Sequence, residues 1–98
     1  MPKERLPDGS VRAEVEIVNR LGLHARAAAR FVETASRFAA DVTVANGEET
    51  VSGKSILGLM MLAAAEGTRL VLRATGADAD AALDALMALI ADKFHEGS

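Results

Sequence analysis

The 98-residue chain is 50% apolar and 26% charged, a balance typical of a single folded domain and not of a disordered chain. It contains no cysteine, which excludes disulfides, thiolate zinc sites and cysteine nucleophiles. Its net charge of −3 and aromatic content of 3% argue against a nucleic-acid-binding protein, which would carry basic stripes and stacking rings.

The N-terminal segment, residues 1–10, carries charges and two prolines with no apolar stretch behind them. We therefore expect a flexible lead there and no export signal. The longest apolar run, residues 56–65, is interrupted by Gly58 and is too short to span a bilayer. These features predict a cytoplasmic protein.

The first half of the chain predicts a strand, a loop and a helix. Apolar and polar residues alternate over residues 11–17, the period of a strand with one buried face. Residues 19–23 form a short loop with a glycine hinge, and the alanine-rich residues 25–40 follow as a helix. The apolar stripe expected on that helix consists of Ala28, Phe31, Val32, Ala35 and Phe38.

The second half predicts a hairpin, a short helix, a strand and a final helix. Asn46-Gly47 is a strong hairpin signal between strands at residues 41–44 and 48–51. A compact apolar helix over residues 56–65 follows Ser55 and is expected to stop at Gly67. Residues 68–74 predict a strand, and a last helix begins at Asp78. The apolar stripe expected on that last helix is Leu83, Leu86, Met87 and Ile90, with Phe94 as a candidate addition.

This order of elements predicts an α+β sandwich spanning residues 11–94, followed by a flexible tail at residues 95–98. The pattern alone leaves two arrangements open, a ferredoxin-like fold and other four-stranded sheets covered by helices on one face. The trailing helix favours the second arrangement.

His24 lies where the loop meets the predicted first helix. The first N–H groups of a helix have no partner inside it, so the amides near Ala25 and Arg26 can bind a phosphate at the positive end of the helix dipole. The forked guanidinium of Arg26 suits phosphate oxygens, and the helix end favours a neutral, nucleophilic imidazole. These residues also allow a plainer interpretation, in which His24 only caps the helix and Arg26 is a solvated charge.

Residues 21–28, Leu-Gly-Leu-His-Ala-Arg-Ala-Ala, resemble the active-site signature of HPr, the histidine phosphocarrier of the phosphoenolpyruvate-dependent phosphotransferase system. Residues 53–62, beginning Gly-Lys-Ser-Ile-Leu-Gly, resemble the regulatory-serine signature of the same family at the family's spacing. The resemblance covers about residues 11–94 and implies an open-faced sandwich, with a four-stranded antiparallel sheet in the order 1-4-2-3 covered on one face by three helices.

By position, the resemblance implies that His24 is the phospho-acceptor, modified at Nδ1, and that Arg26 is the phosphate-facing arginine. Many members of the family carry proline where this chain has Ala27. Alanine leaves one more free N–H and a looser first turn, so this departure bears on the rate of phosphorylation.

Ser55 is expected to cap the short apolar helix with its hydroxyl. The resemblance adds that a dedicated kinase phosphorylates this serine in some bacteria, which presents about two negative charges to an acidic partner. Residues 56–62 hold too many apolar side chains to face one way on a short helix, so an exposed docking patch is expected. The partner-binding residues implied by the family are Ala27, Ile56, Leu57 and Met60. The alternative is that this helix buries both of its sides.

Two other motifs do not support a function. Gly53-Lys54-Ser55 resembles the end of a P-loop, but five residues separate Gly47 from Gly53 where the motif requires four. His95 is the only other histidine and no cysteine assists it, so we expect no metal site and no cofactor.

The predicted function is that of a phosphoryl carrier that is not itself an enzyme. His24 would accept a phosphoryl group from a phosphoenolpyruvate-charged partner of the Enzyme I type and pass it to an acceptor of the Enzyme IIA type. We expect a monomer, with a serine kinase/phosphorylase as a further candidate partner. The alternative is a regulatory carrier of the nitrogen branch that acts through protein–protein binding, controlled at Ser55, and a third hypothesis is a purely structural domain.

Overall fold

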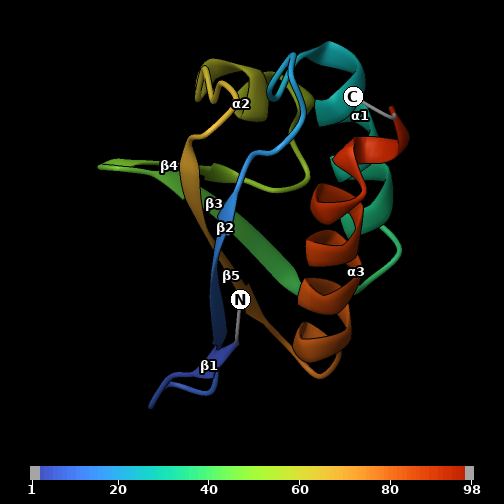
Figure 1. Cartoon of the computed structure of the whole chain (residues 1–98). Coiled ribbons are helices and arrows are strands. Elements are labelled where there is room, and N and C mark those ends of the chain that lie inside the picture. Colours follow the sequence, from blue (N-terminus) through green and yellow to red (C-terminus); the bar gives the residue numbers. More distant parts are fainter. Residues whose placement is uncertain (1–2, 97–98) are drawn as a thin grey trace.

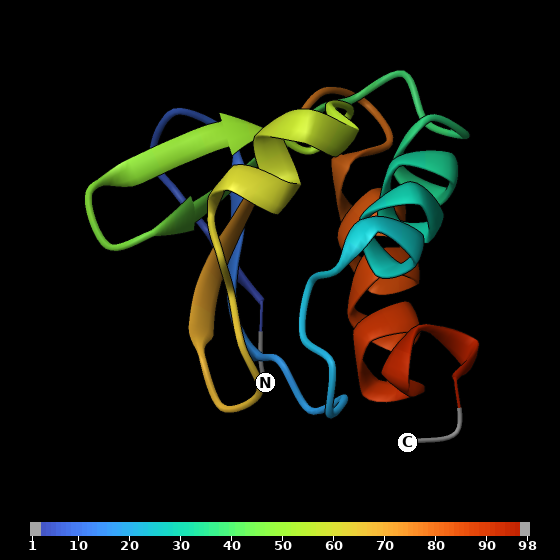
Figure 2. The same ribbon diagram turned by 90° about the horizontal axis from the view of Figure 1, so that it is seen from above.

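The structure is a computed structural model that describes residues 3–96. Its elements in chain order are β1 (Glu4–Arg5), β2 (Val11–Glu16), α1 (Ala25–Ala35), β3 (Asp41–Asn46), β4 (Glu49–Ser52), α2 (Ile56–Met61), β5 (Arg69–Thr75), α3 (Ala79–Ala91) and the short turn η1 (Lys93–His95). The strands form one antiparallel sheet in the order β1-β2-β5-β3-β4. The helices lie on one face of this sheet (Figures 1 and 2), and the other face is uncovered.

The sheet confirms the expected open-faced sandwich, since β2-β5-β3-β4 is the predicted order 1-4-2-3. Apolar residues at every second position of the three inner strands face the helices and are buried. At the centre of the sheet, Leu72 of β5 pairs with Ala13 of β2 on one side and with Val44 of β3 on the other. The alternation that was visible in the sequence therefore sets the strand register.

Helix α1 ends at Ala35, five residues before the predicted end at residue 40. The N–H groups of Ala39 and Ala40 donate to the two carboxylate oxygens of Asp78, at 2.9 and 2.8 Å. These bonds hold residues 39–40 against the start of α3. The two amides therefore cannot donate to carbonyls of a continuing α1. The prediction was too long because it could not include this tertiary contact.

Helix α2 is also shorter than predicted and does not stop at Gly67. It ends at Met61, and Ala63 has a positive φ of 52°. The carbonyl of Leu62 accepts from the Asn46 side chain at 3.1 Å, and the carbonyl of Ala64 accepts from the Leu23 N–H at 2.8 Å. The chain after Met61 is therefore held by bonds to the rest of the fold and not by a helical ladder.

The C-terminal end of the chain turns back on itself after α3. Asp78 is the N-cap residue of this helix, which begins at Ala79 and ends at Ala91. Phe94 is fully buried, as its place in the apolar stripe suggested, but it lies in η1 and not on the helix. Lys93, Phe94 and His95 all have positive φ, so the chain reverses its course and brings Glu96 back toward α1.

The N-terminal lead contributes an extra strand to the sheet. Glu4 and Arg5 of β1 pair with Arg12 and Val11 of β2, and ion pairs join Lys3 and Arg5 to Asp80 on α3. This short strand carries no apolar alternation, which is why the sequence did not indicate it. Residues 1–2 of the expected lead and residues 97–98 of the expected tail lie outside the described residues.

Asp78 offers a test of how the fold responds to pH. The N–H groups of Ala39 and then Ala40 stabilise its charged form and hold its pKa below the ordinary value. A carboxyl whose pKa is lower in the folded state stabilises the fold above its unfolded pKa and loses that contribution as pH falls through the folded value. We therefore expect Asp78→Asn to lower the free energy of unfolding at about pH 7, and this difference from wild type to shrink toward about pH 3.

Urea unfolding of both proteins at the two pH values would measure this difference. The mutation also removes one of the two hydrogen-bond acceptors, so a residual effect is expected at low pH. A difference of the same size at both pH values would show that the charge of Asp78 is unimportant.

Candidate functional site

His24 is the N-cap residue of α1 and has extended backbone angles, with φ −73° and ψ 178°. Its Nδ1 accepts a hydrogen bond from the backbone N–H of Arg26 at 3.2 Å. A backbone N–H can only donate, so Nδ1 faces it with its lone pair. The atom expected to take the phosphoryl group is thus unprotonated and held at the start of a helix.

The loop before His24 is fixed from two sides. Gly22 has a φ of 69°, and the N–H of the next residue, Leu23, donates to the Ala64 carbonyl in the segment after α2. The side chain of Asn19, which is fully buried, donates to the Gly22 carbonyl at 2.8 Å. The histidine ring therefore projects from a loop of defined shape.

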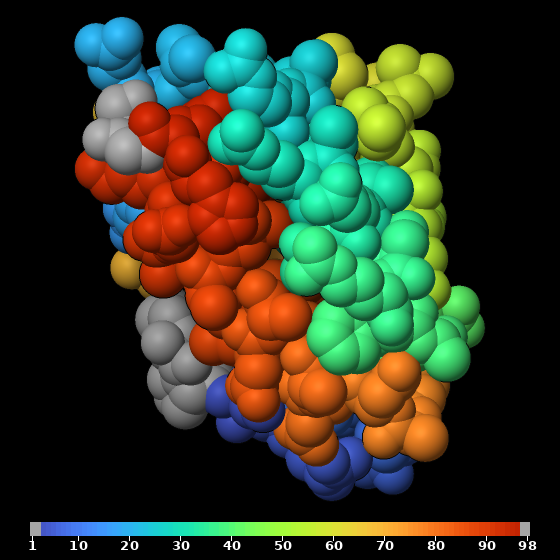
Figure 3. Space-filling model, turned by 90° about the vertical axis from the view of Figure 1, so that its right-hand side faces the viewer, coloured from blue at the N-terminus to red at the C-terminus, as the bar shows by residue number. Residues whose placement is uncertain are grey.

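The ring is also in contact with the far end of the chain. Nε2 of His24 pairs with the Glu96 carboxylate, 72 residues away in the sequence. The other oxygen of Glu96 accepts from Nδ2 of Asn19 at 3.1 Å. The space-filling view shows the end of α3 and η1 packed beside α1 (Figure 3), in agreement with the contacts between α1 and η1.

Sequence reasoning missed both Glu96 and Asn19. Neither belongs to a motif or to a periodic pattern, and Glu96 falls in the segment that was expected to be a flexible tail. The available signal was Phe94, whose apolar side chain two residues before Glu96 indicates that this part of the chain reaches the core.

The turn that carries Glu96 is held in an unfavourable backbone conformation. Lys93, Phe94 and His95 have φ values of 54°, 56° and 65°. Left-handed backbone costs about 1–2 kcal/mol for each residue other than glycine and persists only where surrounding contacts impose it. Those contacts are the burial of Phe94 and a hydrogen bond from the Arg30 guanidinium on α1 to the Phe94 carbonyl.

The residues that follow His24 on α1 have different environments. Ala25 and Arg26 are exposed, whereas Ala27 is fully buried and adds no side-chain surface to a docking patch. The Arg26 amide is already bound to Nδ1, and within residues 3–96 the N–H groups of Ala25 and Ala27 donate to no acceptor. The helix start therefore offers amides to an anion beside the imidazole ring.

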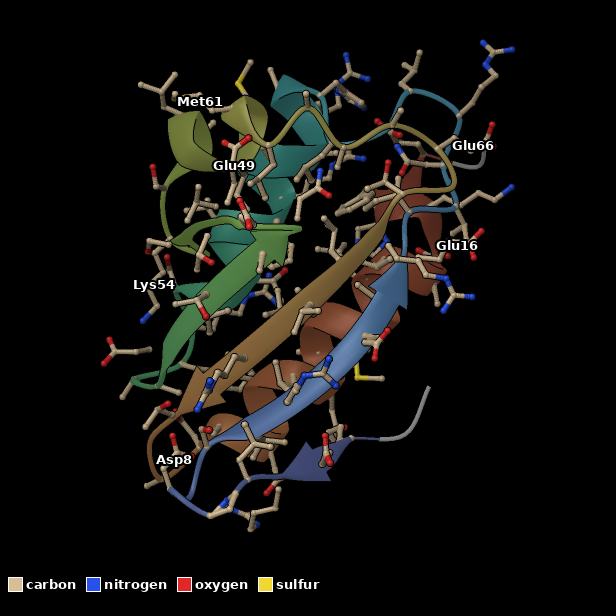
Figure 4. All side chains as sticks on the ribbon, turned by 90° about the vertical axis from the view of Figure 1, so that its left-hand side faces the viewer. Asp8, Glu16, Glu49, Lys54, Met61 and Glu66 are labelled. Carbon is tan, nitrogen blue, oxygen red and sulfur yellow. The ribbon has the colours of Figure 1, made fainter. Side chains whose placement is uncertain are left out.

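Ser55 is the N-cap residue of α2, and its hydroxyl accepts from the Gly58 N–H at 3.0 Å, which confirms its predicted capping role. The side chains on the outer side of this helix are largely exposed, whereas Leu59 and Leu62 are buried. The exposed set, which we call the α2 patch, is Ile56, Leu57, Met60 and Met61. Met61 points away from the body of the molecule (Figure 4).

Comparison with known proteins decides the family. Residues 11–92 match the family model for the phosphorylation site of the HPr component of the phosphotransferase system. The chain is 51% identical over 87 residues to the phosphocarrier protein HPr of Neisseria meningitidis serogroup A, covering 89% of this chain and 98% of that protein. The chain belongs to the HPr family.

Two further HPr-family relatives bear on fold and function. The crystal structure of HPr-C-His from Thermoanaerobacter tengcongensis is similar at a TM-score of 0.84 and 44% identity, covering 87% of this chain and 96% of that one. The phosphocarrier protein NPr of Shewanella violacea is 49% identical over 85 residues, covering 87% of this chain and 93% of that protein. Over residues 3–96, no helix is both long and apolar enough to cross a membrane.

Proposed function

We propose that this HPr-family chain carries a phosphoryl group on Nδ1 of His24. It receives the group from a phosphoenolpyruvate-charged Enzyme I type protein and gives it to an Enzyme IIA type acceptor in the cytoplasm. The observation that carries the proposal is the position of Nδ1, whose lone pair lies at the N-terminus of α1. About a quarter of the His24 side chain is exposed, at 26%, so a partner can approach the ring.

The transfer can be written with the atoms of the site. The Nδ1 lone pair forms the bond to phosphorus while the bond from phosphorus to the donor atom breaks, and its electron pair leaves with the donor. Because Nδ1 can then no longer accept from Arg26, that N–H becomes free to donate to a phosphoryl oxygen. Arg26 is exposed and lies two residues after His24 in the sequence, so its guanidinium can supply a second donor to the phosphoryl group.

The site is expected to stabilise a bound phosphoryl group only weakly. A helix N-terminus contributes roughly 0.3–2 kcal/mol to a bound anion. A carrier needs weak support, because a tightly held phosphoryl group could not be passed on. The chain thus acts as substrate and donor, and residues of its partners complete the in-line transfer.

Incubation with an Enzyme I type protein and phosphoenolpyruvate tests the proposal. We expect one phosphoryl group to be added, and to be lost on mild acid treatment as phosphohistidine is. An acid-stable adduct, or no adduct, would contradict the proposal.

A second candidate function is regulation through protein binding. It is supported by the similarity to the NPr of Shewanella violacea and by the exposed α2 patch. Ser55 lies at the edge of this patch, and a phosphate on its hydroxyl would place about two negative charges beside it. A serine kinase would then control access of acidic partners to the patch.

Met60→Asp distinguishes docking from chemistry. Met60 is 41% exposed in the α2 patch, so a carboxylate there should leave the fold intact but oppose the burial of apolar surface by a partner. We expect the affinity for the Enzyme I type partner, measured by titration calorimetry, to fall at least about tenfold. This corresponds to a loss of about 1.4 kcal/mol in binding free energy.

The matched control is Ala81→Asp, which adds the same charge at an exposed position on α3. It should bind partners as wild type does. If regulation is the main function, control of the regulated enzyme should survive His24→Ala and fail with Met60→Asp. Equal binding by Met60→Asp and wild type would exclude the α2 patch as the docking surface.

A further inference from the structure

We propose that Glu96 is a positioning residue for His24: its carboxylate holds the proton of the neutral ring on Nε2 and so keeps Nδ1 unprotonated, as attack on the phosphoryl group requires. The inference rests on the proposed function of His24 and adds a residue that neither sequence signature contains. Three features of the site support it.

The first feature is the tautomer of the ring. Nδ1 accepts from the Arg26 N–H, so in the neutral ring the single proton belongs to Nε2. Nε2 faces the Glu96 carboxylate, which accepts that proton's hydrogen bond. Both nitrogens thus have partners that select the same tautomer, the one required for attack by Nδ1.

The second feature is that Glu96 is itself held in place. Only 9% of its side chain is exposed, and its second oxygen accepts from Asn19. The same Asn19 nitrogen donates to the Gly22 carbonyl, so both of its partners are acceptors and the amide orientation is fixed. Within the described residues, the buried Oδ1 of Asn19 has no hydrogen-bond partner, which is unfavourable. The opposite orientation of the amide would instead remove the hydrogen bonds to Glu96 and Gly22.

The third feature is the left-handed turn at Lys93–His95. Burial of Phe94 and the bond from Arg30 keep this turn closed against α1. Without the reversal, a chain leaving α3 would not bring Glu96 to the ring. An imposed backbone conformation next to a reactive group is typical of a functional site.

The chemical effect follows from the arrangement. A carboxylate hydrogen-bonded to one nitrogen of an imidazole orients the ring and fixes which nitrogen of the neutral ring carries the proton. As Nδ1 bonds to phosphorus, the ring keeps its Nε2 proton and gains positive charge, which faces the negative Glu96. The carboxylate lies on the side of the ring away from Nδ1, so it leaves room for the incoming phosphoryl group.

Imidazole NMR of the phosphate-free protein tests the proposal independently of any transfer. In wild type we expect an Nε2–H signal of His24 that exchanges slowly with water, and an Nδ1 shift typical of an unprotonated nitrogen. Glu96→Ala should lose the slow exchange and move both ring nitrogens toward a mixture of tautomers. Glu96→Gln keeps a carbonyl acceptor and should lie between the two.

The same variants should differ in phosphorylation by the Enzyme I type partner. Loss of a residue that orients a metal-binding histidine typically reduces activity about 10–100-fold. By analogy, we expect kcat of Glu96→Ala to fall by about tenfold or more with little change in KM. Glu96→Gln should lose less. Glu33→Gln, which removes the same charge at an exposed position on α1, should match wild type in both measurements.

A wild-type Nε2–H signal in Glu96→Ala would overturn the proposal, whatever the rate. A lower rate with an unchanged imidazole spectrum would also overturn it, since the residue would then act in docking. If wild type shows the predicted spectra but accepts no phosphoryl group, the proposed function fails while the positioning of the ring by Glu96 stands.

Discussion

Replacing His24 by alanine is expected to abolish the acid-labile phosphate completely. The variant removes the only imidazole in the signature at residues 21–28, and its nitrogen is the nucleophile of the proposed transfer. Mass spectrometry before and after mild acid, following incubation with phosphoenolpyruvate and the Enzyme I type protein, measures the loss.

Two further variants make this result specific. His95→Ala removes the other histidine, which is exposed and paired with Asp92, and should be phosphorylated as wild type is. His24→Asn keeps a side chain that can cap α1 but has no nucleophilic ring, so it separates the chemistry from a cap worth about 0.5–2 kcal/mol. Phosphate on either His24 variant would place the acceptor elsewhere.

Gly22→Ala should cause the largest loss of stability among the changes considered. The residue has a φ of 69°, and a Cβ atom there would lie 2.4 Å from the Ala64 carbonyl oxygen. That carbonyl is backbone and already accepts from the Leu23 N–H, so it cannot move without breaking a bond. The backbone conformation costs about 1–2 kcal/mol, and the overlap adds about 1–3 kcal/mol.

Gly47→Ala is the matched control. It has a similar φ of 63°, but a Cβ atom there would meet nothing within 4 Å. We therefore expect urea unfolding to show a loss of about 1–2 kcal/mol for Gly47→Ala and about 2–5 kcal/mol for Gly22→Ala. Equal losses would show that the close approach to Ala64 has no energetic consequence.

Local sequence patterns were sufficient for most of the fold. Two strand signals are local in the sequence: the period-2 alternation over residues 11–17 and the Asn46-Gly47 hairpin. Both structures are determined by residues close together in the chain, so the sequence alone identifies these strands. The ends of α1 and α2 were predicted too late because distant groups bind the backbone of the segments that follow them. Asp78 binds the amides of Ala39 and Ala40, and Asn46 binds the carbonyl of Leu62. No local propensity contains that information.

The candidate site divides in the same way. His24 and Arg26 could be found from sequence, since a helix start and its flanking residues are contiguous. Glu96 could not, because 72 residues and a reversed turn separate it from the ring that it contacts. The exposure of the α2 patch followed from counting apolar residues on a short helix, whereas the burial of Ala27 needed the packing of α1 against its neighbours.

The uncovered face of the sheet has a consequence for self-association. Its outward positions on β2 and β5 include side chains of both charges, of which Figure 4 labels Glu16; they are Arg12, Glu14, Glu16, Arg69 and Arg73. Arg12 and Glu14 approach each other to 3.2 Å along this surface while still reaching water. Stacking a second sheet on this face would desolvate several charged side chains, at a cost of several kcal/mol for each ion. The uncovered face of the sheet therefore disfavours aggregation without a layer of helices to cover it.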